Sequence, residues 1–169
     1  PGAFTGIRTA CAAAQGLAWA VDRPVICVPT LTAAAVLFFR EQPDVRRVLI
    51  ALDARMHECY VQAFEAGHPD APAALSEPAA VKPSEIGNLV CEFNCGAAAG
   101  SAFAVYPEAT ESAGCPVFAG LEVTSRGVAL LARTMFMKGE VVTASLASPI
   151  YVRNRVALTI KERQAGEKL

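Results

Sequence analysis

The strongest constraint on the fold is a pair of strand-like runs separated by only four residues. The first run, VLIALDA, spans residues 48–54, and the second, CYVQAFEA, spans residues 59–66 with partial alternation of apolar and polar side chains. Apolar runs of this length that contain β-branched residues are typical of strands. Because a four-residue connection suits an antiparallel pair, the sequence predicts a β-hairpin over residues 48–66.

Helix-forming and strand-like segments alternate on either side of this hairpin. Helices are expected over residues 5–21, 30–40, 84–90 and 124–138. Further strands are expected over residues 25–28 and 91–95. The other segments are a loop with edge-like pieces over residues 67–83, a small flexible stretch over residues 96–100 and an extended piece over residues 149–153. Short connections between helices and strands predict an α/β protein.

The composition excludes some classes of function. The chain has 169 residues, of which 53% are hydrophobic and 18% charged, which is enough for one domain or two small lobes with a core. Its net charge of −1 gives no overall attraction to nucleic acid. No apolar stretch reaches the roughly 18 residues that a membrane-spanning helix needs, and no signal peptide is visible. We therefore expect a cytoplasmic protein.

The cysteines and the first residues add two expectations. The six cysteines lie in apolar or strand-like contexts, and none forms a Cys-x-x-Cys pair. We expect reduced thiols that fill the core, as is usual in the cytosol. The chain begins Pro1-Gly2, in the middle of what reads as a loop motif, so we expect an upstream segment to be missing.

Few residues form a catalytic or metal-binding pattern. The histidines, His57 and His68, are eleven residues apart, and Cys91 and Cys95 have no histidine beside them, so no metal site is expected. His57 and Cys59 could lie on one side of a strand as a base and a thiol nucleophile. A turn histidine beside a buried cysteine is the favoured interpretation of that pair.

Three further features have a structural and a functional interpretation. Residues 1–6, PGAFTG, resemble an anion-binding cradle before a helix, but they lack the lysine of a P-loop, and the glycines would equally permit tight packing. Asp53, Arg55 and Glu58 flank the hairpin turn, where they could serve acid–base chemistry or form a solvated turn with an ion pair. Arg8 stands among small residues in the first expected helix, which favours a contact surface.

Four parts of the chain together resemble the bacterial TsaB (YeaZ) family. They are residues 1–8 with 16–18, residues 51–60, residues 100–103 and residues 149–153, which follow the order of that family's sequence blocks. The matching positions include Pro1, Gly2, Phe4, Thr5, Gly6, Asp53, Arg55, Glu58, Tyr151 and Arg153. The chain departs from the family pattern at Ala3, where a serine is usual, and at Ser101, where an asparagine is usual.

The resemblance implies an α/β fold of the actin-like ATPase (ribonuclease H-like) kind with two lobes. The family's opening strands precede the point where this chain starts, so the first lobe is expected to be incomplete at the N-terminus. We expect the remainder of the first lobe in residues 1–44, the second lobe in residues 45–148, and a C-terminal segment with a charged tail in residues 149–169.

The resemblance also implies a role in making threonylcarbamoyladenosine on tRNA. It implies a non-catalytic scaffold or activating subunit that pairs with the catalytic paralogue TsaD and the ATPase TsaE, forms a homodimer in isolation, meets tRNA only indirectly and needs no cofactor. The partner surface carried over from the family consists of Ile7, Arg8, Cys11, Ala12, Gln15 and Trp19. The alternatives are a nucleotide-binding regulatory module and a peptidase-like hydrolase of the Cys/His type.

Overall fold

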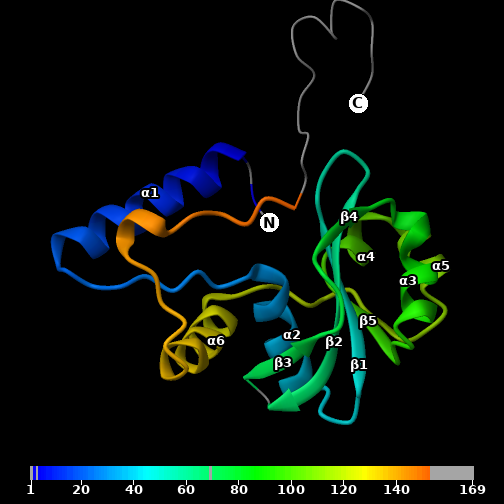
Figure 1. Ribbon diagram of the computed structural model, residues 1–169. Coiled ribbons are helices and arrows are strands. Elements are labelled where there is room, and N and C mark those ends of the chain that lie inside the picture. Colours follow the sequence, from blue (N-terminus) through cyan, green and yellow to red (C-terminus); the bar gives the residue numbers. More distant parts are fainter. Residues whose placement is uncertain (1, 3, 69, 153–169) are drawn as a thin grey trace, which may run out of the picture.

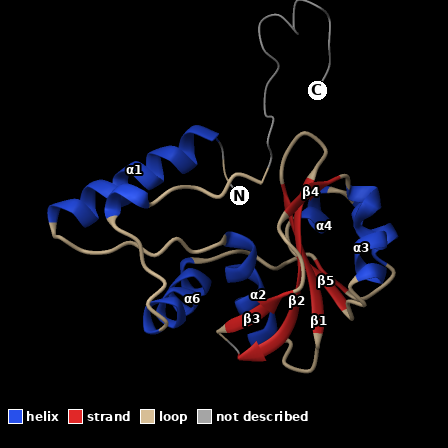
Figure 2. Ribbon diagram, in the orientation of Figure 1, coloured by secondary structure: helices blue, strands red, loops and turns tan. Residues whose placement is uncertain are grey.

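The computed structural model describes residues 2, 4–68 and 70–152, which form a mixed sheet with helices on both faces (Figures 1 and 2). The helices are α1 (Phe4–Ala20), α2 (Thr30–Glu41), α3 (Ile86–Glu92), α4 (Ala102–Val105), α5 (Pro107–Ala113) and α6 (Ser125–Met137). The strands are β1 (Arg47–Asp53), β2 (Cys59–His68), β3 (Ala71–Ala74), β4 (Ala79–Val81), β5 (Ala97–Ala99) and β6 (Val117–Phe118). Two short 3-10 turns are η1 (Pro83–Glu85) and η2 (Ala144–Leu146).

The predicted hairpin is confirmed as the centre of the sheet. β1 and β2 pair antiparallel from Arg47 opposite Glu65 to Asp53 opposite Cys59. The strand order is β3-β2-β1-β5-β6, and β4 also pairs with β2. β5 runs parallel to β1, and β6 runs parallel to β5, so the sheet is mixed and the expected α/β class is confirmed. None of the described helices has both the length and the apolar character that crossing a membrane requires.

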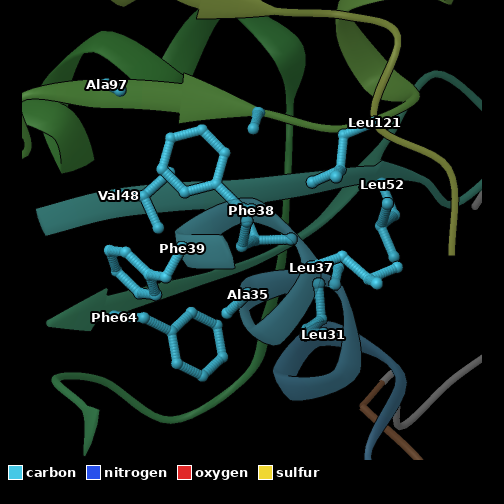
Figure 3. Close-up of a cluster of buried hydrophobic side chains, with 13 residues drawn as sticks. Leu31, Ala35, Leu37, Phe38, Phe39, Val48, Leu52, Phe64, Ala97 and Leu121 are labelled. Atoms are coloured by element: carbon cyan, nitrogen blue, oxygen red, sulfur yellow. The ribbon is translucent and has the colours of Figure 1, made fainter. Parts of the chain in front are cut away.

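The sheet has a separate apolar core on each face, because successive strand residues point to opposite sides. Val48, Ile50 and Leu52 of β1 pack with α2. Figure 3 shows this core, in which Phe38 meets Phe39 edge-on with ring centroids 5.5 Å apart. The alternate residues of β1, Leu49 and Ala51, pack against α3, α4 and α5 on the other face. α2 is therefore covered by the sheet on one side and by α6 on the other.

The four predicted helices are confirmed within a few residues at each end. α1, α2 and α6 match the expected segments, and η1 with α3 covers the segment expected over residues 84–90. Thr124 stands at the N-cap position of α6 as expected, but its side chain makes no capping hydrogen bond. The loop expected over residues 67–83 contains the edge strands β3 and β4, which both pair with β2.

Two strand predictions are wrong. Residues 91–95 form the end of α3 and the turn after it, and the strand is β5, in the stretch expected to be flexible. Three alanines form this strand because helices cover the sheet on both faces, so small side chains fit there. Residues 25–28 are extended, but within the described residues they form only an isolated bridge between Val25 and Val142, since no second strand lies alongside.

α1 lies apart from the sheet, beside the chain segment that follows α6 (Figure 1). It packs against η2, so the first described helix is held mainly by the last described segment. The predicted boundary at residue 44 falls in the turn between α2 and β1, although α2 packs on the sheet of the following segment. The division into lobes remains a prediction, and the C-terminal segment expected from residue 149 is described only as far as Val152.

Candidate functional site

The carboxyl ends of the parallel strands β1 and β5 bring two of the family-like segments together. The Asp53 backbone N–H, at the end of β1, donates a hydrogen bond to Ser101 Oγ at 3.1 Å. Gly100, directly after β5, has φ of +130°, and a Cβ there would lie 2.1 Å from the backbone oxygen of Ala51. Only glycine permits this approach, so the segments 51–60 and 100–103 form one site.

The Asp53 carboxylate is fully engaged by its neighbours. The Tyr106 hydroxyl donates a 2.8 Å hydrogen bond to Oδ1, and the Arg55 backbone N–H donates another at 2.8 Å. The Arg55 guanidinium pairs with Oδ2 at 3.2 Å. Burial, and then the hydrogen bond to Asp53, raises the pKa of Tyr106 to about 12, so this hydroxyl stays protonated and donates. This arrangement fixes the end of β1, with both carboxylate oxygens in contact with neighbouring groups.

The hairpin tip has an unusual backbone. Arg55, Met56 and His57 have φ values of 63°, 54° and 57°, so three consecutive residues other than glycine are left-handed. Each such residue costs about 1–2 kcal/mol, so the surroundings must hold the tip in place. His57 Nε2 lies 2.9 Å from Glu108 Oε1, and its ring meets Tyr106 edge-on at 5.2 Å. Residues of α5 and the chain before it therefore support the tip.

The geometry is unfavourable for a Cys/His nucleophile. Cys59 is completely buried, and this burial, with the nearby charges of Asp53, Glu108 and Glu58, raises the pKa of its thiol to about 12. A thiol with such a pKa forms almost no thiolate at neutral pH, and the thiolate is the nucleophile. His57 is exposed and pairs with Glu108 instead. The described residues contain no group of three or more His, Cys, Asp or Glu side chains placed to hold a metal ion.

The residues predicted as a partner surface divide between two faces of α1. Ile7 and Cys11 are half-buried and line a mainly apolar cleft of about 610 Å³. Residues 25–31, residues 147–152 and residues of the β1–β2 hairpin, including Arg55, form its other walls. Gln15 is also half-buried, and its Nε2 donates a 2.8 Å hydrogen bond to the backbone oxygen of Ala147. Ala12 and Trp19 are exposed on the remaining surface.

Arg8 links two family-like segments from opposite ends of the chain. Its Nε donates a 3.0 Å hydrogen bond to the Tyr151 hydroxyl, and its guanidinium carbon lies 5.7 Å from the centre of that ring. Both side chains are exposed. This contact, with that of Gln15, attaches α1 to the C-terminal segment. Among residues 2, 4–68 and 70–152, nothing covers the opposite side of the helix.

The opening glycine loop is only partly described. A Cβ at Gly2 would lie 3.1 Å from Ile7 Cγ1, which supports a role of this glycine in close packing. Thr5 and Gly6 are exposed at the start of α1. Pro1, Ala3 and Arg153 lie outside the described residues, and nothing is described for the Phe4 side chain.

Sequence reasoning missed several residues that the structure brings to these two places. Tyr106 and Glu108 complete the hairpin site, and only their position after the segment 100–103 could have indicated this. Gly16 and Ala20 continue the exposed side of α1 from Ala12, and their four-residue spacing was the available signal.

The chain matches a family model described as TsaD, tRNA N6-adenosine threonylcarbamoyltransferase, over residues 1–145. This match and the mixed sheet define the broad class as that of TsaD-like α/β proteins. Solved structures agree with that class. A Pseudomonas aeruginosa protein described as uncharacterized, with similarity to peptidase YEAZ, has a TM-score of 0.77 and 31% identity over 90% of this chain and 70% of its own. YeaZ from Pseudomonas aeruginosa has a TM-score of 0.74 and 30% identity, covering 89% and 70%.

Curated relatives narrow the class further. The Escherichia coli tRNA threonylcarbamoyladenosine biosynthesis protein TsaB is 30% identical over 160 residues, which are 93% of this chain and 69% of the relative. The Haemophilus influenzae protein of the same name is 48% identical over 60 residues, 36% of this chain and 25% of the relative. The chain belongs to the TsaB (YeaZ) family, as the resemblance of its sequence segments predicted.

Proposed function

We propose that this protein is a non-catalytic scaffold and activating subunit in the biosynthesis of threonylcarbamoyladenosine on tRNA. In this proposal it acts in the cytoplasm, pairs with the catalytic paralogue TsaD, is joined by the ATPase TsaE, and forms a homodimer when TsaD is absent. The names of its curated relatives support the pathway. With a net charge of −1, the chain would reach tRNA through its partners.

The observation that carries the proposal is the uncovered side of α1. Ala12, Gly16 and Ala20 recur every four residues and are all exposed, so they form one small-residue stripe. Leu17 and Trp19 flank this stripe and are 73% and 77% exposed. Large apolar side chains with this exposure are typical of interaction surfaces, and tryptophan is enriched among residues that dominate binding energy.

A helix is the partner element that fits this surface. Packed helices approach to 8–10 Å between axes, and the shortest approaches require small side chains at the contact. A Cβ at Gly16 would have no atom of the described residues within 4 Å, so the space beside the stripe is open in the described part of the chain. We expect a partner helix to lie along the stripe and to pack against Leu17 on one side and Trp19 on the other.

The hairpin site supports the non-catalytic part of the proposal. Asp53 has its two carboxylate oxygens occupied, Cys59 has a thiol pKa of about 12, and His57 is paired with Glu108. None of these groups is arranged as a nucleophile with its base. The site instead joins the carboxyl ends of β1 and β5, from which the family-like segments follow.

The deciding experiment is size-exclusion chromatography with light scattering on mixtures with TsaD. Gly16→Leu should weaken the TsaD complex and the homodimer by roughly tenfold or more, because leucine fills the space that the partner helix needs. Leucine is also a good helix former, so α1 should stay folded. Trp19→Ala should weaken both complexes in the same direction.

Gly120→Leu is the matched control, because a Cβ at Gly120 also meets nothing within 4 Å and this glycine lies outside α1. It should leave both complexes unchanged. Unchanged binding of Gly16→Leu and Trp19→Ala would exclude α1 as the partner surface. A chain that binds no TsaD under any condition, although folded by circular dichroism, would contradict the subunit role itself.

A further inference from the structure

Three cysteines gather at one corner of the fold, away from α1 and the hairpin site. Cys91 is exposed near the end of α3, Cys115 is half-buried before β6, and Cys95 is buried before β5. All three are free thiols. Cys95 and Cys115 precede the amino ends of β5 and β6, which are neighbouring parallel strands.

The helices before these strands end in the same way and side by side. α3 is followed by the left-handed residue Asn94, and α5 by the left-handed residue Gly114. Cys95 follows Asn94 and leads into β5, and Cys115 follows Gly114 and leads into β6, which is parallel to β5. Because both helices lead into adjacent parallel strands on one face, their C-terminal ends are neighbours.

The two helices are also in very close contact. A Cβ at Gly87 in α3 would lie 2.1 Å from the backbone oxygen of Ser112 in α5. Cys91 lies one helical turn after Gly87, on the same side of α3, and Cys115 lies three residues after Ser112. The closest contact between the two helices, at Gly87 and Ser112, is therefore followed along the sequence by Cys91 on one side and Cys115 on the other.

The turn after α3 brings Cys95 to the same corner. The Cys95 N–H donates to the Val90 oxygen at 2.9 Å, and the Asn94 N–H donates to the Cys91 oxygen at 3.1 Å, as in a Schellman turn. Cys95 and Cys115 pack in the same apolar core. Burial and the neighbouring Cys115 raise the pKa of Cys95 to about 11, and burial with the neighbouring Cys91 raises the pKa of Cys115. These two electrostatic interactions indicate that Cys115 lies near both Cys91 and Cys95.

We propose that Cys91 and Cys115 form a reversible intrachain disulfide when the protein meets a low-molecular-weight disulfide, with Cys91 as the accessible entry point. The Cys91 thiolate attacks one sulfur of the small disulfide, which breaks the S–S bond and releases one small thiolate. The Cys115 thiolate then attacks the Cys91 sulfur and releases the second small thiolate.

The two protons lost by the cysteines pass to the two released thiolates, so two protein thiols are oxidised and one small disulfide is reduced to two thiols. The raised pKa of Cys115 makes its attack slow at neutral pH and faster in mild alkali. Cys95 is buried behind this pair and is protected from the first attack.

The test treats the folded, full chain with oxidised glutathione and follows intact mass and peptide maps without reduction. Wild-type protein should pass through a glutathione adduct on Cys91 and reach a product lighter by two hydrogens, with a Cys91–Cys115 link. Cys115→Ser should stop at the adduct, and Cys91→Ser should show neither species on the same time scale. Cys115→Ala repeats the test if the serine variant folds poorly.

Cys11→Ser is the matched control, since Cys11 lies on α1, far along the chain from this corner, and should leave the reaction unchanged. A stable Cys91 adduct in wild-type protein that never closes to a disulfide would overturn the proposal. A first adduct on Cys115 or Cys95, with Cys91 unmodified, would overturn the assigned order of attack.

Discussion

Helices α1 and α2 are both rich in alanine and other apolar residues, yet the fold places them in opposite environments. Eight of the twelve residues of α2 are buried between the sheet and α6. In α1, Ala18 is the one buried residue among those whose side chains are described. Burial of α2 is stabilising mainly through its large side chains, because a buried phenylalanine or leucine contributes about 1.5–3 kcal/mol and an alanine methyl about 0.8 kcal/mol.

The comparison teaches that apolar character alone does not determine burial. α2 carries Phe38 and Phe39, which fill the space over the sheet, and the energy of that core depends on them. α1 owes its helicity mainly to alanine, the best helix former, and its docking to a few contacts at Arg8 and Gln15. Leu17 and Trp19 of α1 are exposed, as the proposed partner surface requires.

The largest expected effect is a difference in the stability lost when a large side chain is removed from α2 or from α1. Phe38→Ala should lower the free energy of unfolding by about 3–5 kcal/mol, because it leaves a cavity in a core where the side chain is 1% exposed. Trp19→Ala in α1 should change the stability by less than about 0.5 kcal/mol. Urea titrations followed by circular dichroism measure both, since Trp19 is the sole tryptophan and fluorescence would be lost. Equal losses of unfolding free energy in the two variants would contradict the conclusion that α2 is a core helix and α1 is not.

The next effect compares two glycines in helices. A Cβ at Gly127 of α6 would lie 2.8 Å from the Ala33 oxygen of α2, so Gly127→Ala should destabilise the fold by roughly 1–3 kcal/mol. Gly16→Ala in α1 should instead stabilise by about 0.5–1 kcal/mol, because its Cβ meets nothing and alanine favours the helix. Thermal unfolding checks the opposite signs, and two shifts in the same direction would contradict the assigned environments.

A further effect, of comparable size, comes from alkaline pH and acts on the sheet core. Burial raises the pKa of Cys59 to about 12 and that of Cys95 to about 11, whereas an unfolded thiol has a pKa of about 8.5. Stability from these thiols is therefore fully present below about pH 8.5 and is lost as the pH rises through 11 to 12, by at most about 1.4 kcal/mol per unit for each thiol.

Unfolding titrations at pH 8 and pH 10 measure this loss, with Cys59→Ala and Cys95→Ala as comparisons that should each show a shallower fall. The slope with pH is compared rather than the absolute stability, because the variants also create small cavities. Identical slopes in wild-type and variant proteins would mean that the thiols ionise alike when folded and unfolded.

The smallest effect concerns the attachment of α1. Tyr151→Phe removes the hydroxyl that accepts from Arg8, and the exposed contact should cost less than about 0.5 kcal/mol of global stability. The amides of α1 should nevertheless exchange with solvent faster, because the helix opens locally from the C-terminal segment. Hydrogen exchange measures this, and faster exchange in α2 as well would indicate that α1 is more strongly coupled to the sheet.

The sequence predicted most of the regular elements because their patterns are local. The central hairpin and the main helices follow from apolar periodicity and short connections. β5 could not be predicted, because three alanines carry no strand signal and become a strand only through pairing with β1. For the same reason, the strand expected over residues 91–95 lies a few residues before the observed strand β5 in the sequence.

The candidate sites could be predicted only in part. The family resemblance followed from short motifs in order, and the comparisons confirm it. The contact between Asp53 and Ser101 could not be predicted, because it joins residues 48 positions apart through parallel pairing. The division of α1 into a docked and an uncovered side also depends on residues more than a hundred positions away, such as Tyr151.

The attachment of α1 has a consequence for synthesis of the chain. The contacts of Gln15 and Arg8 span 132 and 143 residues, so α1 is synthesised well before the segment that holds it in place. At about 5–20 residues per second, the ribosome needs on the order of ten seconds to supply the anchoring segment. During that time the sheet can form around α2, whereas α1 has not yet docked onto its anchoring segment and has Leu17 and Trp19 exposed. Nascent chains would therefore be open to premature association through the surface that we propose for partner binding.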